Sequence, residues 1–393
     1  MRLKISARKS DLARLQAYMV GEALKKAHPS LQLEFRFKES LGDKNLTDPL
    51  WKIPEKGLFT EDFYGELIRE ETDLVVHSWK DLPTEQKPDT VIAATLPRAD
   101  QRDLFLFKAS QEQQVRESGA LRVYSSSPRR EYNLSPFLKT HLPFPLEKVE
   151  FQSVRGNIPT RVRKLLEDPQ VDALIVAKAA LDRLLVAEQA EFKEVRELLR
   201  SYLQQVKWMV LPLSINPNAA AQGALAIEVK STRQDILRLL EPIHSAETAL
   251  CAQKERDILA SHGGGCHQKI GVAVLHRPYG VVTLLNGLTD QGVILQQRSL
   301  QSSAAAPRFS SDKMWSEEVQ GERVPLTPSA PLSSLHQALY VAKASAWPAH
   351  LKFSGVLWAA GLTTWKKLAE AGQWVHGCAE SLGEHEDPRV DIL

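Results

Sequence analysis

The sequence predicts an α/β protein built from two lobes that a hinge joins. Short apolar runs alternate with amphipathic stretches, which is the pattern expected for strand–helix–strand units in a mostly parallel sheet. The alternation occurs twice, in residues 1–97 and again in residues 98–220, and residues 221–242 return to the first region. Because the chain crosses twice between the two regions, we expect a cleft between two hinged lobes.

The composition excludes several classes of protein. At 393 residues the chain is too long for one compact core, and its net charge of +2 gives no broad basic field for nucleic acid or an anionic membrane. No apolar run approaches membrane-spanning length, and residues 1–5 are not followed by the apolar segment of a secretion signal. Three distant cysteines indicate neither a disulfide framework nor a zinc site. We therefore expect a cytoplasmic protein that binds no nucleic acid or membrane.

The first lobe begins with a strand over residues 3–6 and a helix that starts at Ser10. Arg8 lies in the turn between them, a place that suits an anion contact, although a solvated surface arginine is the alternative. Residues 31–37 alternate as a second strand, and a loop rich in Gly, Asp and Pro follows over residues 39–56. These elements give the first strand–helix–strand unit of the lobe.

A third apolar strand follows a helix that begins at Thr60, and this strand ends abruptly in a polar cluster containing Asp81. In open α/β sheets, ligands bind at the carboxyl ends of the strands, so a carboxylate there can lie near a substrate that is becoming cationic. The alternative is that Asp81 caps the turn beside Pro83. Residues 91–96 then form another strand of the same lobe.

The second lobe contains a strand over residues 121–124 that leads directly into a helix start. Three hydroxyl residues before Pro128 and two arginines after it suit a carboxylate or a phosphate. An ordinary capped helix with exposed arginines is the alternative. The residues concerned are Ser125, Ser126, Ser127, Arg129 and Arg130.

A second basic group follows in the same lobe. Arg155 and Arg161 lie on either side of a helix start near Pro159, and Arg183 lies on the helix after a buried strand over residues 173–176. Guanidinium groups pair with carboxylates bidentately and keep their charge in a dry cleft. Several arginines beside strand ends therefore indicate a polyanionic ligand.

Beyond this region the sequence predicts a charged helical stretch over residues 187–207, a crossing loop over residues 212–223 and a returning strand over residues 224–229. A third, small domain spans residues 243–300 and contains one helix and three antiparallel strands. We expect these elements over residues 247–260, 270–275, 281–288 and 293–299.

The remainder divides into a linker and a C-terminal extension. Residues 301–332 are rich in Ser, Ala and Pro, which is typical of a linker. The extension, residues 333–393, is predicted to contain a helix with Leu335, Leu339 and Ala342 on one face. A strand over residues 355–358 and a helix over residues 364–371 are expected to follow it.

Three glycines precede Cys266, so a bulky group can approach its sulfur closely. A structural cysteine rarely needs this arrangement, which indicates a reactive or modified thiol; a flexible loop with an incidental cysteine is the alternative. His262 and His267 suggest a metal site, but a single cysteine without paired spacing does not supply a ligand set, and we predict no metal.

Taken together and in order, these motifs identify a resemblance to the porphobilinogen deaminase (hydroxymethylbilane synthase) family over about residues 1–300. Each motif is weak alone, and the specificity comes from their combination. The matching stretches are Lys56-Gly57-Leu58-Phe59, His77-Ser78-x-Lys80-Asp81-x-Pro83, Ser126-Ser127-x-Arg129-Arg130, Arg155-Gly156-Asn157-x-x-Thr160-Arg161, Gln222-Gly223-Ala224 and Gly264-Gly265-Cys266.

The resemblance implies an enzyme that condenses four porphobilinogen molecules head to tail with release of ammonia, and then hydrolyses off a linear tetrapyrrole. It implies two lobes like those of type II periplasmic binding proteins, with a third α/β domain bearing a dipyrromethane cofactor on Cys266 through a thioether. Asp81 matches the catalytic aspartate, which assists loss of the amino group and stabilises the resulting azafulvenium cation.

The resemblance also assigns the remaining site residues, because each pyrrole carries an acetate and a propionate. Those matched to cofactor binding are Lys80, Ser126, Arg129, Arg130 and Arg155. Those matched to substrate binding are Arg8, Lys56, Phe59, Ser78, Ser125, Ser127, Arg161 and Arg183, with Phe59 on a mobile loop over the active site.

The sequence departs from the family pattern at several places. Asp11 and Lys269 replace prolines, and Ala220-Ala221 replaces a Val-Gly pair, a change that we expect to stiffen the hinge. The extension continues beyond the usual C-terminus of the family and slightly resembles part of uroporphyrinogen III synthase, so we interpret it as an accessory module or a docking module for that enzyme. A two-lobed binding protein for small polycarboxylates is the alternative function, but it needs neither Cys266 nor Asp81.

Overall fold

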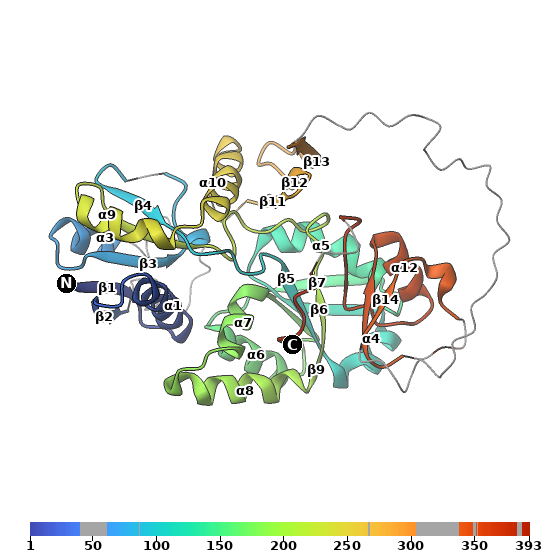
Figure 1. Ribbon diagram of the computed structural model, residues 1–393. Coiled ribbons are helices and arrows are strands. Elements are labelled where there is room, and N and C mark those ends of the chain that lie inside the picture. The colour runs from blue at the N-terminus through green and yellow to red at the C-terminus, as the bar shows by residue number, and fades with distance from the viewer. Residues whose placement is uncertain are drawn as a thin grey trace.

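A computed structural model describes residues 1–39, 61–85, 87–265, 268–303, 338–348, 351, 353–382 and 387–393. The predictions for Lys56, Phe59, Cys266, Leu335 and most of the linker lie outside the described residues. The described chain forms a mixed α/β fold with two five-stranded and two three-stranded sheets, which confirms the α/β class (Figure 1). No helix in these ranges is both long and apolar enough to cross a bilayer.

The first five-stranded sheet has the order β2-β1-β3-β10-β4. Strand β1 runs parallel to β2 and β3, whereas β10 lies antiparallel between β3 and β4. Leu3, Ile5 and Ala7 of β1 alternate into the core, where they meet the apolar face of helix α1. The elements are β1 (Arg2–Arg8), α1 (Asp11–Ala27), β2 (Gln32–Lys38), α3 (Glu61–Ile68), β3 (Leu74–Ser78), the 3-10 turn η2 (Trp79–Asp81), β4 (Thr90–Ala94), β10 (Leu225–Lys230), α9 (Gln234–Leu240) and η5 (Glu241–Ile243).

The second five-stranded sheet has the order β7-β6-β8-β5-β9 and repeats the plan of the first. Strand β6 is parallel to β7 and β8, and β5 lies antiparallel between β8 and β9. The elements are β5 (Asp103–Lys108), η3 (Ala109–Gln111), α4 (Glu112–Ser118), β6 (Ala120–Tyr124), α5 (Pro128–His141), β7 (Lys148–Gln152), α6 (Ile158–Glu167), β8 (Ala173–Ala177), α7 (Lys178–Leu185), η4 (Ala190–Phe192), α8 (Lys193–Leu203) and β9 (Val206–Val210).

Two segments connect these sheets: residues 95–102 pass from β4 to β5, and residues 211–224 return from β9 to β10. The predicted crossing loop and returning strand are therefore confirmed. Ala221, at a position where the resemblance implies glycine, is buried in the second crossing with a left-handed φ of 62°. Its backbone N–H donates to Glu255 Oε2 over 2.7 Å. This hydrogen bond helps to hold the left-handed backbone conformation, although an alanine replaces the glycine that would adopt it more readily.

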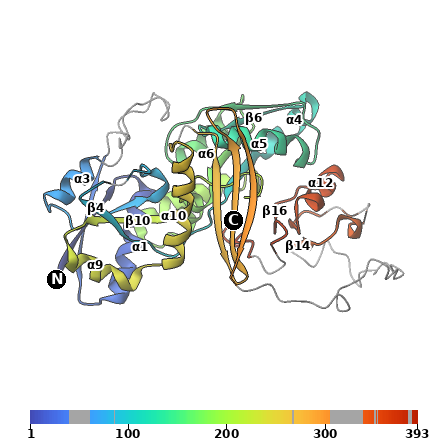
Figure 2. The ribbon, with the colours of Figure 1, turned by 90° about the horizontal axis from the view of Figure 1, so that it is seen from above.

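The third sheet is antiparallel in the order β11-β12-β13 and packs against helix α10, as the sequence predicts. Figure 2 shows α10 beside this sheet, between the first and second five-stranded sheets. Ser245 caps α10 by accepting the N–H of Thr248. The elements are α10 (Ala246–Ser261), β11 (Gly271–Arg277), β12 (Gly280–Leu288) and β13 (Ile294–Ser302), so β13 runs slightly past the predicted start of the linker.

The C-terminal extension forms a parallel sheet in the order β14-β15-β16 with one helix, α12. The predicted helix through Leu339 and Ala342 is wrong, because Leu339 lies in β14 and Ala342 follows it outside any helix. The predicted strand and second helix of the extension are confirmed. The elements are β14 (Ala338–Val341), η7 (Ala344–Ala346), β15 (Val356–Ala359), α12 (Leu362–Glu370) and β16 (Gly377–Cys378).

The extension packs on the second sheet, on the side away from the first (Figure 1). Trp365 of α12 is fully buried against α5 and donates its indole N–H to the carbonyl of His141. Leu357 and Val375 join the same core cluster, and the N–H of Val210 in β9 donates to the carbonyl of His376. The extension is thus part of the core around the second sheet.

Candidate active site

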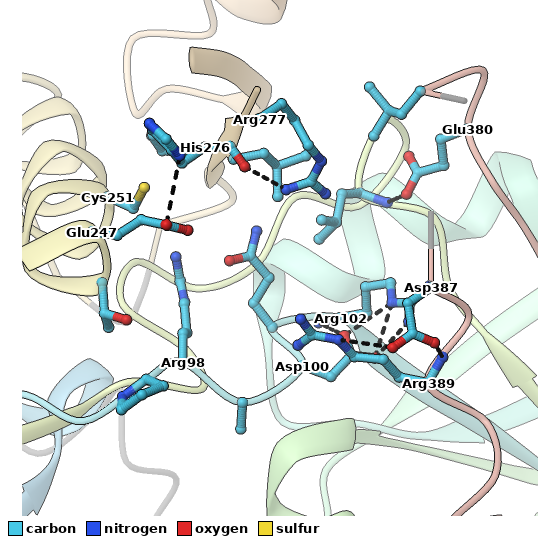
Figure 3. A pocket seen from close by; sticks show the side chains of 18 of the residues that line it. Arg98, Asp100, Arg102, Glu247, Cys251, His276, Arg277, Glu380, Asp387 and Arg389 are labelled. Carbon is cyan, nitrogen blue, oxygen red and sulfur yellow. Dashed lines mark hydrogen bonds and ion pairs between the residues drawn. The ribbon is translucent and has the colours of Figure 1, made fainter. Parts of the chain in front are cut away.

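Two of the cavities among the described residues are large enough to hold a small molecule. The larger, of about 510 Å³, lies between the first crossing, α10, β11 and the extension, and it contains none of the predicted site residues (Figure 3). Buried charges along its wall are already paired, Arg98 with Glu255 and Arg102 with Asp100. The smaller cavity, of about 330 Å³, is the one that collects the predicted residues.

Both five-stranded sheets contribute to the smaller cavity, and the second crossing forms part of its wall. This confirms the expectation of a cleft between the two α/β regions. Eight of the predicted site residues line it: Arg8, Ser78, Lys80, Asp81, Arg130, Arg155, Arg161 and Arg183.

Asp81 reaches the cavity because β3 ends in the turn η2 at the edge where β1 also ends. Parallel strands present their carboxyl ends at the same edge of a sheet, so Arg8 comes close, with Nη1 4.0 Å from Asp81 Oδ2. The Asp81 side chain is 40% exposed, which leaves its carboxylate accessible from the cavity. Ser78, at the end of β3, donates to Gln16 of α1 over 3.1 Å.

Positive charge is concentrated around this carboxylate. The lining contains six basic residues, Arg8, Lys80, Arg130, Arg155, Arg161 and Arg183, against two acidic ones, Asp11 and Asp81, which leaves an excess of four positive charges. Burial lowers the pKa of Arg161 to about 10, and the neighbouring charges of Arg130 and Arg155 add to the shift. Burial likewise lowers the pKa of Arg183 to about 10. Crowded guanidinium groups of this kind favour a ligand that supplies negative charge.

Lys80 connects the two regions at the base of the cavity. Its ammonium group donates to Gln222 Oε1 over 3.3 Å, and the amide of Gln222 donates in turn to Asp103 Oδ1 over 2.9 Å. Burial lowers the pKa of Lys80, and the adjacent charge of Asp81 opposes that shift. Lys80, which precedes Asp81 in the sequence, is therefore held by Gln222 of the second crossing.

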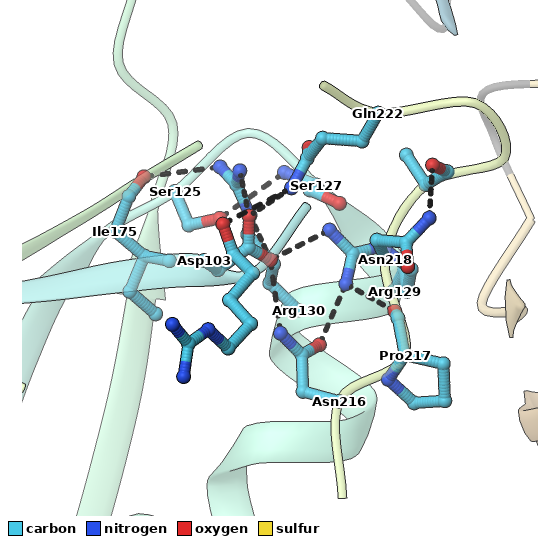
Figure 4. A network of polar contacts seen from close by, with 12 residues as sticks. Asp103, Ser125, Ser127, Arg129, Arg130, Ile175, Asn216, Pro217, Asn218 and Gln222 are labelled. Carbon is cyan, nitrogen blue, oxygen red and sulfur yellow. Dashed lines mark hydrogen bonds and ion pairs between the residues drawn. The ribbon is translucent and has the colours of Figure 1, made fainter. Parts of the chain in front are cut away.

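Asp103 is the centre of a buried polar network that sequence reasoning missed (Figure 4). Its Oδ1 accepts from Arg130 over 2.7 Å, and its Oδ2 accepts from Arg129 over 2.7 Å and from Asn216 over 2.9 Å. Burial alone would raise the pKa of Asp103, but Arg130 and Arg129 hold it well below the ordinary range. The available signal was a carboxylate at the start of the apolar run Leu104–Phe107.

The two adjacent arginines have different surroundings. Arg130 lines the cavity, whereas Arg129 lies beneath it with its guanidinium bonded to Asp103, Asn216 and the Pro217 carbonyl. The three serines before α5 also lie outside the lining. Ser126 Oγ donates to the Val154 carbonyl, and Ser125 Oγ accepts the Ser127 N–H. These hydroxyls organise the loop next to the cavity.

The glycine run approaches the strand end that carries Asp81. Gly263, Gly264 and Gly265 all have positive φ values, of 98°, 63° and 112°. A Cβ on Gly264 would lie 2.8 Å from Thr84 Oγ1, so only glycine allows this close approach. In the described ranges, no group of three His, Cys, Asp or Glu side chains is placed to hold a metal ion, and His267 lies outside those ranges.

Comparison with known proteins gives a consistent result. Residues 3–238 match the family model described as "Porphobilinogen deaminase, dipyromethane cofactor binding domain". The porphobilinogen deaminase of Syntrophomonas wolfei is 35% identical over 286 residues, covering 73% of this chain and 84% of that protein. That of Lawsonia intracellularis is 34% identical over 310 residues, covering 78% and 91%.

The chain is also similar to a third porphobilinogen deaminase and, more distantly, to a solved structure. The porphobilinogen deaminase of Chloroherpeton thalassium is 36% identical over 269 residues, covering 68% of this chain and 77% of that protein. The crystal structure of YhfZ from Shigella flexneri is 13% identical with a TM-score of 0.31, covering 65% of this chain and 90% of that one. This structural similarity is too low to identify a fold.

Proposed function

The chain belongs to the porphobilinogen deaminase family, transferases of tetrapyrrole biosynthesis with a dipyrromethane cofactor, and we propose that its arginine-lined cavity is where the linked pyrroles are built. The observation that carries this proposal is an accessible carboxylate, Asp81, at the end of β3 among six basic side chains of one cavity; the other acidic residue of the lining, Asp11, pairs with Arg14. A binding protein for polycarboxylates would need the cations but not the carboxylate.

The residues present fit the cofactor, because each pyrrole carries two carboxylates and the cavity has an excess of cations. We propose Cys266 as the attachment point, supported by Gly264, which lies against Thr84 three residues beyond Asp81. When bound, the cofactor supplies the terminal pyrrole that attacks the incoming substrate. The residues proposed to hold it are Lys80, Ser126, Arg129, Arg130 and Arg155, with Arg129 and Ser126 acting from beneath and beside the cavity.

Asp81 is proposed to assist loss of the amino group of porphobilinogen and to stabilise the positive charge that develops on the substrate. The substrate's carboxylates are assigned to Arg8, Arg161 and Arg183, with Ser78, Ser125 and Ser127 as further donors. Lys56 and Phe59 keep the substrate-binding roles predicted from the sequence.

The experiment compares Asp81→Asn with Asp89→Asn, an exposed carboxylate of the same region that bonds Tyr64 outside the cavity. Asp81→Asn should keep a covalent cofactor, detected by intact mass, yet lose roughly a hundredfold or more of bilane production, because the general acid and the electrostatic stabiliser are lost together. Asp89→Asn should match the wild type. Near-normal turnover by Asp81→Asn would remove the proposed role of Asp81.

The proposal also covers the arrangement of the domains, the cellular location and a partner protein. We infer that the two five-stranded sheets are the cores of two lobes like those of type II periplasmic binding proteins, hinged at the two crossings, and that the third domain carries the cofactor cysteine. A cytoplasmic location is also proposed. Docking of uroporphyrinogen III synthase on the extension is tested by co-sedimentation of the two proteins, and independent sedimentation would exclude it.

A further inference from the structure

A short turn in the second crossing, residues 212–216, links the extension to the arginine network. The N–H of Asn216 donates to the Pro212 carbonyl over 2.9 Å and closes the turn. The first two amides inside it, those of Leu213 and Ser214, donate to the two carboxylate oxygens of Glu380 over 2.8 and 2.6 Å. Figure 3 shows the Glu380 carboxylate of the extension facing this backbone.

Glu380 has a clear physical reason to hold the turn. The first amides of a helical turn have no partner within it, and a carboxylate satisfies both their hydrogen bonds and their partial positive charge. Glu380 is only 7% exposed, so this interaction is shielded from water. Glu380 and Ser381 adopt left-handed φ values of 53° and 59°, a costly conformation for non-glycine residues that surrounding contacts must hold.

The opposite side of the turn is also fixed. Asn286 of β12 donates its side-chain amide to the carbonyls of Ser214 and Ile215 over 2.8 and 3.0 Å. The extension therefore holds the amides of the turn, and the three-stranded sheet of the third domain holds its carbonyls. These contacts leave the turn little freedom to shift.

The turn places Asn216 in the arginine network. Asn216 Oδ1 accepts from Arg129 over 2.8 Å, and Asn216 Nδ2 donates to Asp103, which pairs with Arg130 in the cavity wall (Figure 4). A displacement of the turn would therefore move a direct hydrogen-bond partner of Arg129 and, through Asp103, the counter-ion of Arg130. The contacts run continuously from Glu380 in the extension to Arg130 in the cavity.

We propose that Glu380 is a positioning residue for the deaminase reaction, which fixes the turn at residues 212–216 and through it the geometry of Arg129 and Arg130. The inference rests on the proposed function, in which those arginines hold the carboxylates of the cofactor against which porphobilinogen binds. It gives the extension a role in substrate binding without direct contact with the substrate.

The test compares three full-length variants loaded with cofactor. Glu380→Ala should raise the KM for porphobilinogen about tenfold with less than a threefold change in kcat, because binding of substrate and transition state weakens equally. Hydrogen exchange of the Leu213 and Ser214 amides should accelerate about tenfold. Glu380→Gln, which keeps one acceptor oxygen, should lie between Glu380→Ala and the wild type in both measurements.

Glu370→Ala is the matched control, because Glu370 is an exposed carboxylate of the same extension that pairs with Lys366 on its own helix at 3.9 Å. It should leave KM and exchange unchanged. An unchanged KM in Glu380→Ala overturns the proposal. This holds even if the melting temperature of the variant falls, because a purely structural role would give that result. If Glu380→Ala does not accumulate as folded protein, an unchanged KM in Glu380→Gln overturns it instead.

The wild type separates this inference from the proposed function. A wild-type protein that produces no bilane contradicts the proposed function, whatever the exchange data show. A wild-type protein that produces bilane, with a Glu380→Ala variant of identical KM and exchange, contradicts the positioning role alone.

Discussion

At the scale of single residues, Asp103 shows how one buried carboxylate organises a binding wall. Two arginines beside each other in the interior repel, and each loses its hydration. Asp103 offsets both effects, since it accepts from Arg129 and Arg130 while Asn216 and Gln222 supply its remaining bonds. Arg130, which lines the cavity, is therefore held in place by Asp103, which lies beneath it.

This arrangement predicts a large loss of stability for Asp103→Asn. Removing the charge leaves two buried guanidinium groups without their counter-ion, which should cost about 3–5 kcal/mol in the free energy of unfolding. Asp235→Asn is the control, because Asp235 is 54% exposed and its pair with Arg233 should contribute less than about 1 kcal/mol. Urea unfolding measures both variants, and equal losses would contradict the account of Asp103.

The sequence identified seven of the eight charged residues of the cavity lining, because they stand at strand ends or on the helices that follow them. It could not distinguish Arg129 from Arg130, since neighbours on a helix point about 100° apart and only the packing of α5 decides which one faces the cavity. Asp103 was missed for a related reason. Its role depends on four side chains from two segments that are distant from it in the sequence, and no local pattern brings these together.

At the scale of secondary-structure elements, the predictions from the sequence fail where tertiary contacts override the local hydrophobic pattern. Strand β9 begins in the last two residues of the stretch predicted to be helical, residues 187–207, and its pairing with β5 gives Val206–Val210 a strand conformation. Strand β5 was not predicted, although Leu104–Phe107 is a continuous apolar run of the kind shown by a strand that is buried on both faces. Leu339 forms part of β14 because the parallel neighbour β15 pairs with it.

The extension's packing predicts a pH-dependent stability that depends on His376. Burial lowers the pKa of His376 to about 4, and Nδ1 accepts the N–H of Leu357 over 3.1 Å, so the folded state requires the neutral imidazole. The unfolded state binds a proton near the ordinary value of 6.5. The stabilisation is therefore complete above that pH and is lost as pH falls toward 4, by at most about 3 kcal/mol.

Hydrogen exchange of β15 and β16 between pH 7 and pH 5, corrected for the intrinsic exchange rate, measures this effect. His376→Gln should flatten the dependence. His28→Gln, in the first-sheet region where His28 contacts the Leu239 carbonyl, should leave it unchanged. A wild-type extension that is equally protected at both pH values would contradict the prediction.

At the scale of the whole molecule, two crossings place the cavity between two sheets of the same plan. The sequence predicted the second crossing and the returning strand, since an apolar run follows a loop rich in small residues. It could not predict where the extension packs. That contact joins α12 to α5 across more than two hundred residues of sequence, as the bond from Trp365 to His141 shows.

The central claim is that this chain carries a covalent dipyrromethane cofactor and extends it with porphobilinogen. The most direct measurement is the intact mass of the purified protein, alone and after brief exposure to porphobilinogen. We expect an excess mass equal to two linked pyrroles that rises in one-pyrrole steps with substrate. A chain that stays unmodified with substrate, and after reconstitution with preformed bilane, would contradict it.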